Sequence, residues 1–292
     1  MVILAGLPGT GKSLLVHQLA HLASARGRRV SRLQWDVARP AFEASAAGQR
    51  YPQVDGVTHP IIRRAAGLWA RAAIAVWDRE HRGGDAILVG EAPFAGGRFI
   101  ELARPRDDLA EPLLASAACR FAIALPAVDV RHFLEAERER RTASPLHPRE
   151  REDAPPHVLR ELWRDLAVVA HRLGLGSGTT RPVPEPSERP GRFATGTAET
   201  TPLQPVADED TPPYDPVTYR RVYESVLRHR RSEVVPLEII LPTAGLSAYD
   251  FAIRAPDLIP TEDEAERWVL EVEGQHGDLA ALEREVTRWW DV

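Results

Sequence analysis

Residues 2–22 read VILAGLPGTGKSLLVHQLAHL and contain three successive patterns. The apolar run Val2–Ala5 is short, ends at a glycine and is typical of a buried parallel strand. A glycine-rich stretch follows at residues 6–11. From Leu14 onward, leucines recur at helical spacing, and Gly27 predicts the end of the helix. The order strand, glycine-rich loop, helix predicts an α/β fold with this strand in its sheet.

Residues 6–13 match G-x-x-x-x-G-K-[ST], the pattern of a phosphate-binding loop. Glycines let successive backbone N–H groups point at phosphate oxygens, and the following helix adds the positive end of its dipole. We expect Lys12 to reach the β- and γ-phosphates, and the Ser13 hydroxyl to ligate Mg²⁺. The predicted nucleotide-binding residues are Gly6, Pro8, Gly9, Thr10, Gly11, Lys12, Ser13 and Leu14, with Arg149 added from a later segment.

The composition narrows the class of protein. The chain has 292 residues, of which 43% are hydrophobic and 27% charged, as in ordinary globular proteins. No apolar run approaches the roughly 20 residues that a membrane helix needs. The single cysteine, Cys119, cannot form an internal disulfide, which favours the cytoplasm. The net charge of −5 argues against a large nucleic-acid surface but leaves room for a local basic channel.

The phosphate loop leaves the reaction open, but other features exclude several classes. The chain has no asparagine, and Lys12 is its only lysine, so it lacks the Asn-Lys-x-Asp motif with which GTPases read guanine. Protein kinases use a different glycine loop. Large ring ATPases need an acidic pair after a later strand, and none is found. His17 and His21 have metal-ligand spacing, but no cysteine or carboxylate is placed to complete such a site. Because the motif that reads guanine is absent, ATP is the expected nucleotide.

A second predicted strand, residues 29–35, ends at Asp36, and Arg39 follows three residues later. An acid at the carboxyl end of a strand beside the phosphate loop faces the place where open α/β sheets bind ligands. There Asp36 could accept the proton of an attacking hydroxyl, and Arg39 could hold a phosphate or the acceptor. The alternative is that Asp36 only caps a helix over residues 40–47.

A third predicted strand, residues 86–90, is followed by Glu91 and resembles a Walker B strand. Such an acid binds Mg²⁺ through water or touches the acceptor; the alternative is an acid that begins a helix. Residues 91–98 form a glycine-containing turn at the carboxyl edge of the predicted sheet.

A fourth predicted strand, residues 121–125, leads into an arginine-dense helix over residues 128–141. Arginines near a transferring phosphoryl group stabilise its charge, and a lid that closes over it excludes water. We expect one or two of these arginines to be catalytic. The first choice is Arg138 and Arg141, which share a helix face, followed by Arg149. The alternative is a solvated helix held by Glu–Arg pairs.

Over about residues 1–150, these motifs resemble the P-loop kinase superfamily. The D-x-x-R motif at 36–39 is similar to that of phage-type polynucleotide 5′-hydroxyl kinases, and the layout is similar to zeta toxins and chloramphenicol phosphotransferase. The resemblance implies an α/β, three-layer α/β/α P-loop NTPase of kinase type. It would have a parallel sheet, an arginine-rich helical lid and a C-terminal extension.

The same resemblance implies an enzyme that moves the γ-phosphate of ATP to a hydroxyl with the help of Mg²⁺. Asp36 would be the general base, and Ser13 and Glu91 would hold the metal. The expected catalytic residues are Lys12, Asp36, Arg39, Arg138 and Arg141. A polynucleotide 5′-hydroxyl is the first acceptor we expect, and a nucleoside, sugar-nucleotide or antibiotic is the alternative. A regulatory protein switched by ATP also remains open.

We expect a kinase core over residues 1–175, with its lid at about 127–160. Residues 176–213 contain 8 prolines and repeated threonines, and predict a linker or insertion. The remaining residues, 214–292, are expected to hold helices at 216–230, 265–272 and 279–290, and a strand at 234–241 that could be the fifth of the sheet. The sequence leaves open whether this part completes the base pocket, shapes the acceptor site or forms the face of a homodimer.

Overall fold

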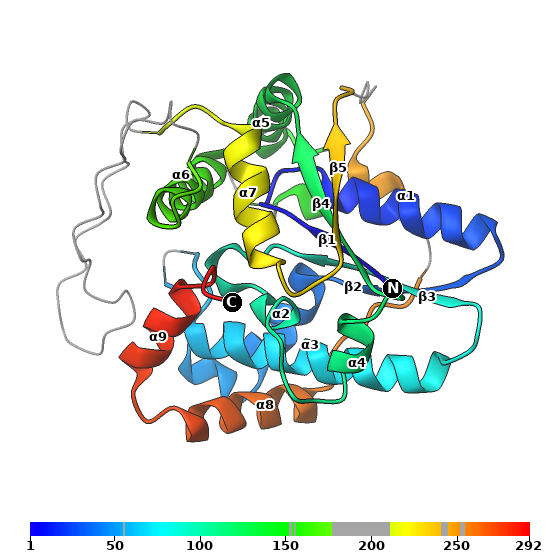
Figure 1. Ribbon diagram of the computed structural model, residues 1–292, viewed down its shortest axis with the longest axis vertical. Coiled ribbons are helices and arrows are strands. Elements are labelled where there is room, and N and C mark those ends of the chain that lie inside the picture. Colours follow the sequence, from blue (N-terminus) through cyan, green and yellow to red (C-terminus); the bar gives the residue numbers. More distant parts are fainter. Residues whose placement is uncertain (55, 152–153, 155, 177–210, 241–244, 252–254) are drawn as a thin grey trace.

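A parallel five-stranded sheet forms the centre of the computed structural model, in the order β2-β3-β1-β4-β5 (Figure 1). The structure describes residues 1–292 except 55, 152–153, 155, 177–210, 241–244 and 252–254. The strands are β1 (Val2–Ala5), β2 (Arg29–Leu33), β3 (Ala86–Ala92), β4 (Arg120–Pro126) and β5 (Ser232–Leu237). Because all five are parallel, their carboxyl ends meet at one edge of the sheet.

Both faces of the sheet are covered, which explains why its central strands are continuous apolar runs. Successive side chains of β1 alternate between the faces: Ile3 and Ala5 join the larger buried cluster, and Leu4 joins the smaller one. Helix α1 covers the smaller cluster, and α3 and α7 lie over the larger one. This arrangement is compatible with a three-layer α/β/α fold.

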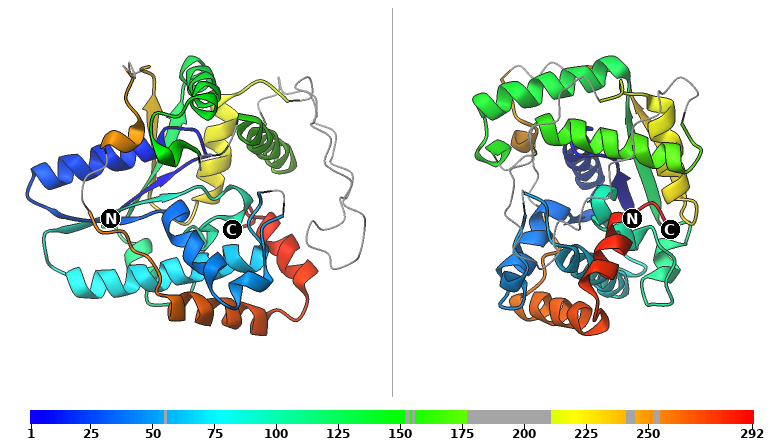
Figure 2. Two further views of the ribbon diagram at one scale, coloured as in Figure 1. Left: turned by 180° about the vertical axis from the view of Figure 1, so that it is seen from behind. Right: turned by 90° about the vertical axis from the view of Figure 1, so that its left-hand side faces the viewer.

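The helices connect and then surround these strands. Their bounds are α1 (Lys12–Ala25), α2 (Trp35–Ala44), α3 (Pro60–His81), α4 (Glu111–Leu114), α5 (Val128–Ala143), α6 (Pro156–Arg172), α7 (Pro216–Val226), α8 (Glu262–Gln275) and α9 (Leu279–Thr287). Helix α8 packs against α3 on its side away from the sheet, and α9 packs against α3 and the loop after β3, whereas α5 and α6 lie at the opposite end of the molecule (Figure 2). No helix in the described part is both long and apolar enough to cross a membrane.

The α/β class and the strand that would be the fifth of the sheet are confirmed. The start of the second helix was predicted wrongly. Pro40 looked like the first residue of a helix over 40–47, but α2 begins at Trp35 and Pro40 lies inside it. Pro40 cannot donate to the carbonyl of Asp36, and its ring crowds that carbonyl, so α2 loses one backbone hydrogen bond there. Of the expected linker, residues 177–210 lie outside the described residues, as does residue 241 of the expected fifth strand.

The segment before α8 closes one edge of the sheet. The backbone N–H of Arg32 in β2 donates to Pro256 O at 2.8 Å, and Leu258 N donates back to Arg32 O at 2.7 Å. The Arg32 side chain pairs with Asp257 at 2.7 Å. These bonds occupy the edge of β2, which would otherwise be open to pairing with another chain.

A buried arginine joins α3 to the segment that leads into β4. Arg71 is 1% exposed and donates to both carboxylate oxygens of Asp108, at 2.6 and 2.8 Å, and to Glu111 at 2.7 Å. It also donates to the carbonyls of Glu101 and Arg104, at 2.7 and 3.0 Å. The chain therefore holds this segment through a fully satisfied buried charge.

Replacing Arg71 with methionine is expected to lower the free energy of unfolding by about 3–5 kcal/mol, because Asp108 loses its partner and Glu111 keeps only Arg230. Arg82, at the end of the same helix, is the matched control. It pairs with Asp78 at 2.7 Å but is 76% exposed, so Arg82→Met should cost under about 1 kcal/mol. Urea unfolding followed by circular dichroism measures both. Equal, small losses would contradict a structural role for the Arg71 network.

Candidate functional site

Residues 6–13, which the sequence predicts to be a phosphate loop and which keep that name below, lie at the carboxyl edge of the sheet, directly after its central strand. From β1 the chain crosses to β2 and returns to β3 on one side, and then passes to β4 on the other side of β1. The strand order therefore reverses at β1. Ligands of open α/β sheets bind at such a point, outside the carboxyl ends of the strands. The predicted loop, residues 6–13, lies there.

Close neighbours explain two of the glycines in the loop. Gly6 has a φ of 153°, and a Cβ at this position would lie 2.6 Å from the hydroxyl of Tyr219. Gly9 has a φ of 73°, and its Cβ would lie 2.8 Å from a methyl of Leu159 in α6. Both positions exclude a larger residue, so α6 and α7 fit tightly over the loop.

The beginning of α1 has the properties of an anion site. Its first backbone bond runs from Leu15 N to Gly11 O at 3.2 Å, so the N–H groups of residues 12–14 have no acceptor within the helix. No side chain caps this end, and the first turn contains no acidic residue. The N–H groups and the helix dipole thus remain available for a phosphate.

Lys12 is buried, with 5% of its surface exposed, and its Nζ donates to Leu7 O at 2.7 Å. Burial lowers the pKa of Lys12 to about 8, against the opposing effect of the carboxylates of Glu91 and Asp36. The positive charges of Arg98 and Arg131 lower this pKa further. A buried ammonium among other cations would be stabilised by a bound anion.

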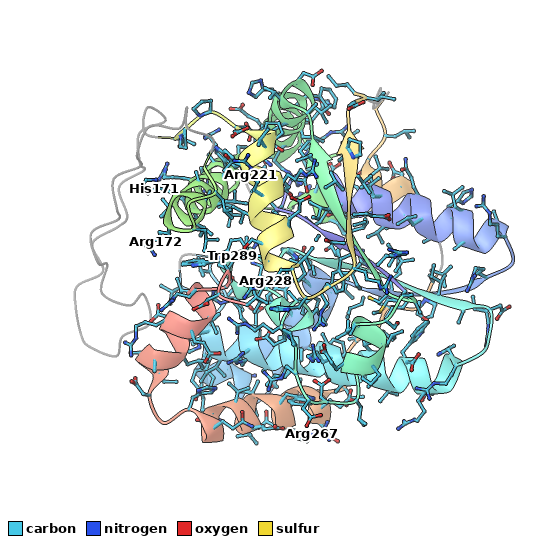
Figure 3. All side chains as sticks on the ribbon, in the orientation of Figure 1. His171, Arg172, Arg221, Arg228, Arg267 and Trp289 are labelled. Atoms are coloured by element: carbon cyan, nitrogen blue, oxygen red, sulfur yellow. The ribbon has the colours of Figure 1, made fainter. Side chains whose placement is uncertain are left out.

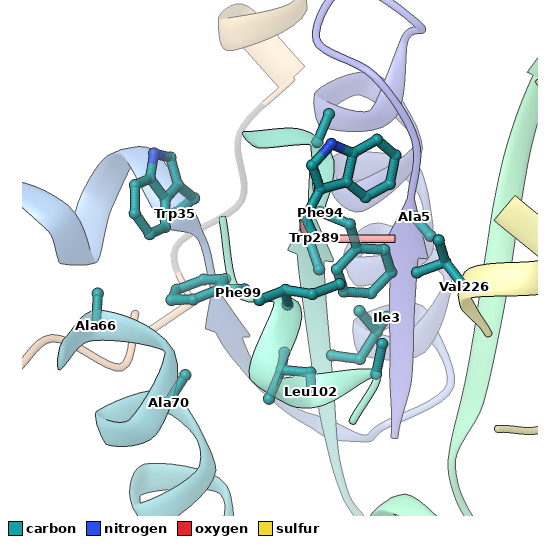
Figure 4. Close-up of a cluster of buried hydrophobic side chains, with 14 of the residues drawn as sticks. Ile3, Ala5, Trp35, Ala66, Ala70, Phe94, Phe99, Leu102, Val226 and Trp289 are labelled. Atoms are coloured by element: carbon teal, nitrogen blue, oxygen red, sulfur yellow. The ribbon is translucent and has the colours of Figure 1, made fainter. Parts of the chain in front are cut away.

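Asp36 lies in the first turn of α2, where its carboxylate is at the positive end of the helix dipole. The side chain is exposed, and it forms no hydrogen bond or ion pair with any residue that the structure describes. The alternative that Asp36 caps a helix at 40–47 is therefore wrong. Trp35 anchors this turn: its ring is buried and meets Phe99 edge-on at 5.2 Å (Figure 4).

Glu91 is buried near the end of β3, in register with Leu4 of β1, the strand that leads into the phosphate loop. Its charge acts on Lys12, whereas the sequence predicted for it only a role toward Mg²⁺ or the acceptor. Ser13 is half-buried in the first turn of α1. Among the described residues, no three His, Cys, Asp or Glu side chains gather into a metal-binding group. The hydroxyl of Ser13 and the carboxylate of Glu91 are oxygen ligands of the kind that Mg²⁺ takes.

Two arginines flank Asp36. Arg39 pairs with Glu43 on the next turn of α2 at 2.7 Å. Arg98, which follows β3, is half-buried, and its charge acts on Lys12. Burial lowers the pKa of Arg98, the Asp36 carboxylate raises it, and Arg39 lowers it. Of these two, only Arg39 was a predicted site residue.

The arginine-dense helix α5 approaches the loop through Arg131. This residue is 1% exposed, pairs with Glu135 at 2.7 Å and donates to Leu159 O at 3.3 Å. Its Nη1 is buried without a hydrogen-bond partner among the described residues. Arg131 thus has one unsatisfied donor close to Lys12.

The arginines preferred from the sequence lie further along the chain. Arg138 and Arg141 are about 10 and 15 Å beyond Arg131 along the helix axis. Arg138 is half-buried; Arg141 is buried and lies 3.4 Å from Glu137 and 3.7 Å from Glu150. Arg149 is exposed, and its charge acts on His17 of α1. The structure does not bring these three to Lys12.

Sequence reasoning missed the contribution of α7. The backbone N–H of Leu7, in the phosphate loop, donates to the Tyr219 hydroxyl at 3.0 Å. The hydroxyl of Tyr223, one turn later, donates to Pro93 O at 2.9 Å, just after β3. The two rings stack at 4.8 Å. Because α7 comes after residues 176–213, no local pattern could have placed these tyrosines at the loop.

No protein-family model, curated protein or solved structure matches this chain. The likeness to P-loop kinases therefore remains one of short motifs. The residues at this edge and their contacts are the basis for a proposed function.

Since Lys12 is the only lysine, carbon-13 labelling of lysine gives a single Cε resonance, whose pH titration reports this residue alone. We expect a midpoint near 8, well below the usual value of about 10.4. Tripolyphosphate should raise the midpoint, because an anion favours the charged ammonium. A midpoint near 10.4 in the free protein would show that Lys12 is not buried in this way.

Proposed function

We propose that this protein is an ATP- and Mg²⁺-dependent phosphotransferase that moves the γ-phosphate onto a hydroxyl group. The observation that carries the proposal is the electrostatic grouping around Lys12. Asp36, in the first turn of α2, and Glu91, near the end of β3, are the carboxylates whose charges act on this lysine. A phosphate-binding cation, a candidate base and a candidate metal ligand thus meet at one edge of the sheet.

Each residue would then have a distinct task. The phosphate loop and the N–H groups of residues 12–14 bind the phosphates, and Lys12 contacts the β- and γ-phosphates. Ser13 and Glu91 hold Mg²⁺, which supplies positive charge to the β- and γ-oxygens when bound. Leu159 and Arg131 cover the loop and help to exclude water.

Asp36 is the proposed general base. The acceptor hydroxyl passes its proton to a carboxylate oxygen of Asp36 while the hydroxyl oxygen forms a bond to the γ-phosphorus. The bond between that phosphorus and the bridging oxygen breaks, and its electron pair leaves with ADP. Because the Asp36 carboxylate is exposed and forms no hydrogen bond or ion pair with a described residue, it can accept this proton without first losing a structural contact.

The polynucleotide 5′-hydroxyl remains the first acceptor to test, on the strength of the D-x-x-R motif at Asp36 and Arg39. An exposed base is compatible with a large acceptor, because the end of a chain must reach it from solvent. Small hydroxyl compounds are the next class.

Asp36→Asn should lower the transfer of γ-labelled phosphate from ATP to a 5′-hydroxyl oligonucleotide by about 10²–10⁴-fold, because the base is lost. ATP binding should stay intact. Asp85→Asn is the matched control: Asp85 is exposed and precedes β3, so it lies at the opposite edge of the sheet. Its transfer rate should equal that of the unaltered protein.

Undiminished transfer by Asp36→Asn would contradict the assignment of the base. If ATP is consumed but the oligonucleotide takes up no label, the acceptor is a small molecule. If ATP binds but is consumed neither with the oligonucleotide nor with small hydroxyl compounds, the protein is not a phosphotransferase, and the ATP-switched regulatory protein takes its place.

A further inference from the structure

The loop after β3 holds Arg98 on an unusual backbone. Phe94 and Phe99 have φ angles of 58° and 57°, and in the described part of the chain they are the non-glycine residues with positive φ. Both rings are fully buried, Phe94 beside Phe121 and Phe99 against Trp35. Such backbone is unfavourable and persists only where surrounding packing imposes it, typically at functional sites.

Further contacts fix the same loop. Phe94 N donates to Arg98 O at 3.0 Å, which closes the loop, and Tyr223 binds Pro93 O. At Gly97 a Cβ would lie 2.6 Å from Val286 of α9, so that helix packs against the backbone immediately before Arg98. The backbone that carries Arg98 is thus held by β3, α7 and α9.

The Arg98 side chain is half-buried, and its guanidinium forms no hydrogen bond or ion pair with any residue that the structure describes. By contrast, Arg71 and Arg230 are buried and are each paired with Glu111. Burial lowers the pKa of Arg98, so the charged form is disfavoured where it lies. A rigid loop that presents an unpaired, disfavoured cation has the properties of an anion-binding site.

The position of this cation points to one anion in particular. The charge of Arg98 acts on Lys12, and the charge of Asp36 acts on Arg98. In the proposed reaction, Lys12 contacts the phosphate that leaves ATP, and Asp36 holds the hydroxyl that attacks it. The phosphoryl group in transfer therefore lies between Lys12 and Asp36, beside Arg98.

We infer that Arg98 is a catalytic residue that contacts the phosphoryl group during transfer, from a fixed loop of the core rather than from the lid. This inference rests on the proposed phosphotransferase function. Negative charge on the transferring group is spread over its three equatorial oxygens, and the planar guanidinium can donate to two of them. A cation fixed in place before the reaction stabilises this charge without reorganising.

The test compares the binding of ADP·Mg²⁺ with and without aluminium fluoride, which mimics the phosphoryl group in transfer, by titration calorimetry. Arg98→Gln should bind ADP·Mg²⁺ like the unaltered protein, but should bind the fluoride complex about 10- to 100-fold more weakly. Arg228→Gln removes an equal charge as the matched control. Arg228 is exposed just beyond α7 and donates to Ser225 O (Figure 3), so both affinities should be unchanged.

Thermal unfolding separates a catalytic from a structural role. Because the guanidinium forms no bond with a described residue, Arg98→Gln should melt at the same temperature as the unaltered protein or higher. A clear drop in melting temperature would overturn the inference.

Two other outcomes would also overturn it: equal weakening of ADP and of the fluoride complex, or no weakening of either. Absence of ADP binding by the unaltered protein would refute the proposed function and this inference together. If tight binding of the fluoride complex depends on Arg98 while no acceptor receives phosphate, the proposed transfer to a hydroxyl is refuted. The contact between Arg98 and the phosphoryl group is then still supported.

Discussion

The burial of Lys12 is the constraint on which the rest of the site depends. An ammonium with 5% of its surface exposed, between two carboxylates and two arginines, is unfavourable until an anion arrives. In the proposed function, phosphates would supply that charge, and the uncapped N–H groups at the start of α1 would bind them as well. The burial of Lys12 would then favour nucleotide binding, because the free protein holds this ammonium without an anion of that kind.

Residues far apart in the sequence hold the loop around Lys12 in place. The loop belongs to residues 6–13, but its backbone is bonded to Tyr219 and closely packed against Leu159. Tyr223, stacked on Tyr219, is bonded at the start of the loop that carries Arg98. Helix α7, from the C-terminal part, thus ties the phosphate loop to the end of β3. A substitution in α7 that removes these contacts would disturb both the phosphate loop and the end of β3, although neither tyrosine needs to touch a substrate.

The sequence predicted what local patterns determine. Apolar runs predicted the strands, and since parallel strands end at one edge, Asp36 was expected where ligands bind and Glu91 at the metal or the acceptor. Helical phase placed Arg138 and Arg141 on one face of α5. Phase does not say which turn of the helix reaches the loop, and in the structure it is the turn that carries Arg131. The sequence did not identify Arg98 as a site residue, because the conformation of its loop depends on non-glycine residues at positive φ, which no turn pattern predicts. The tyrosines of α7 depend on tertiary contacts across more than two hundred residues.

The proposed function requires that Lys12 and its loop bind a nucleoside triphosphate. Equilibrium titration of the unaltered protein and of Lys12→Met with ATP·Mg²⁺ measures this binding. We expect saturable binding to the unaltered protein, with affinity lowered about 100-fold or more in Lys12→Met as charge-assisted contacts to phosphate are lost. The same affinity in both proteins, or no saturable binding at all, would show that Lys12 does not bind the nucleotide in this way.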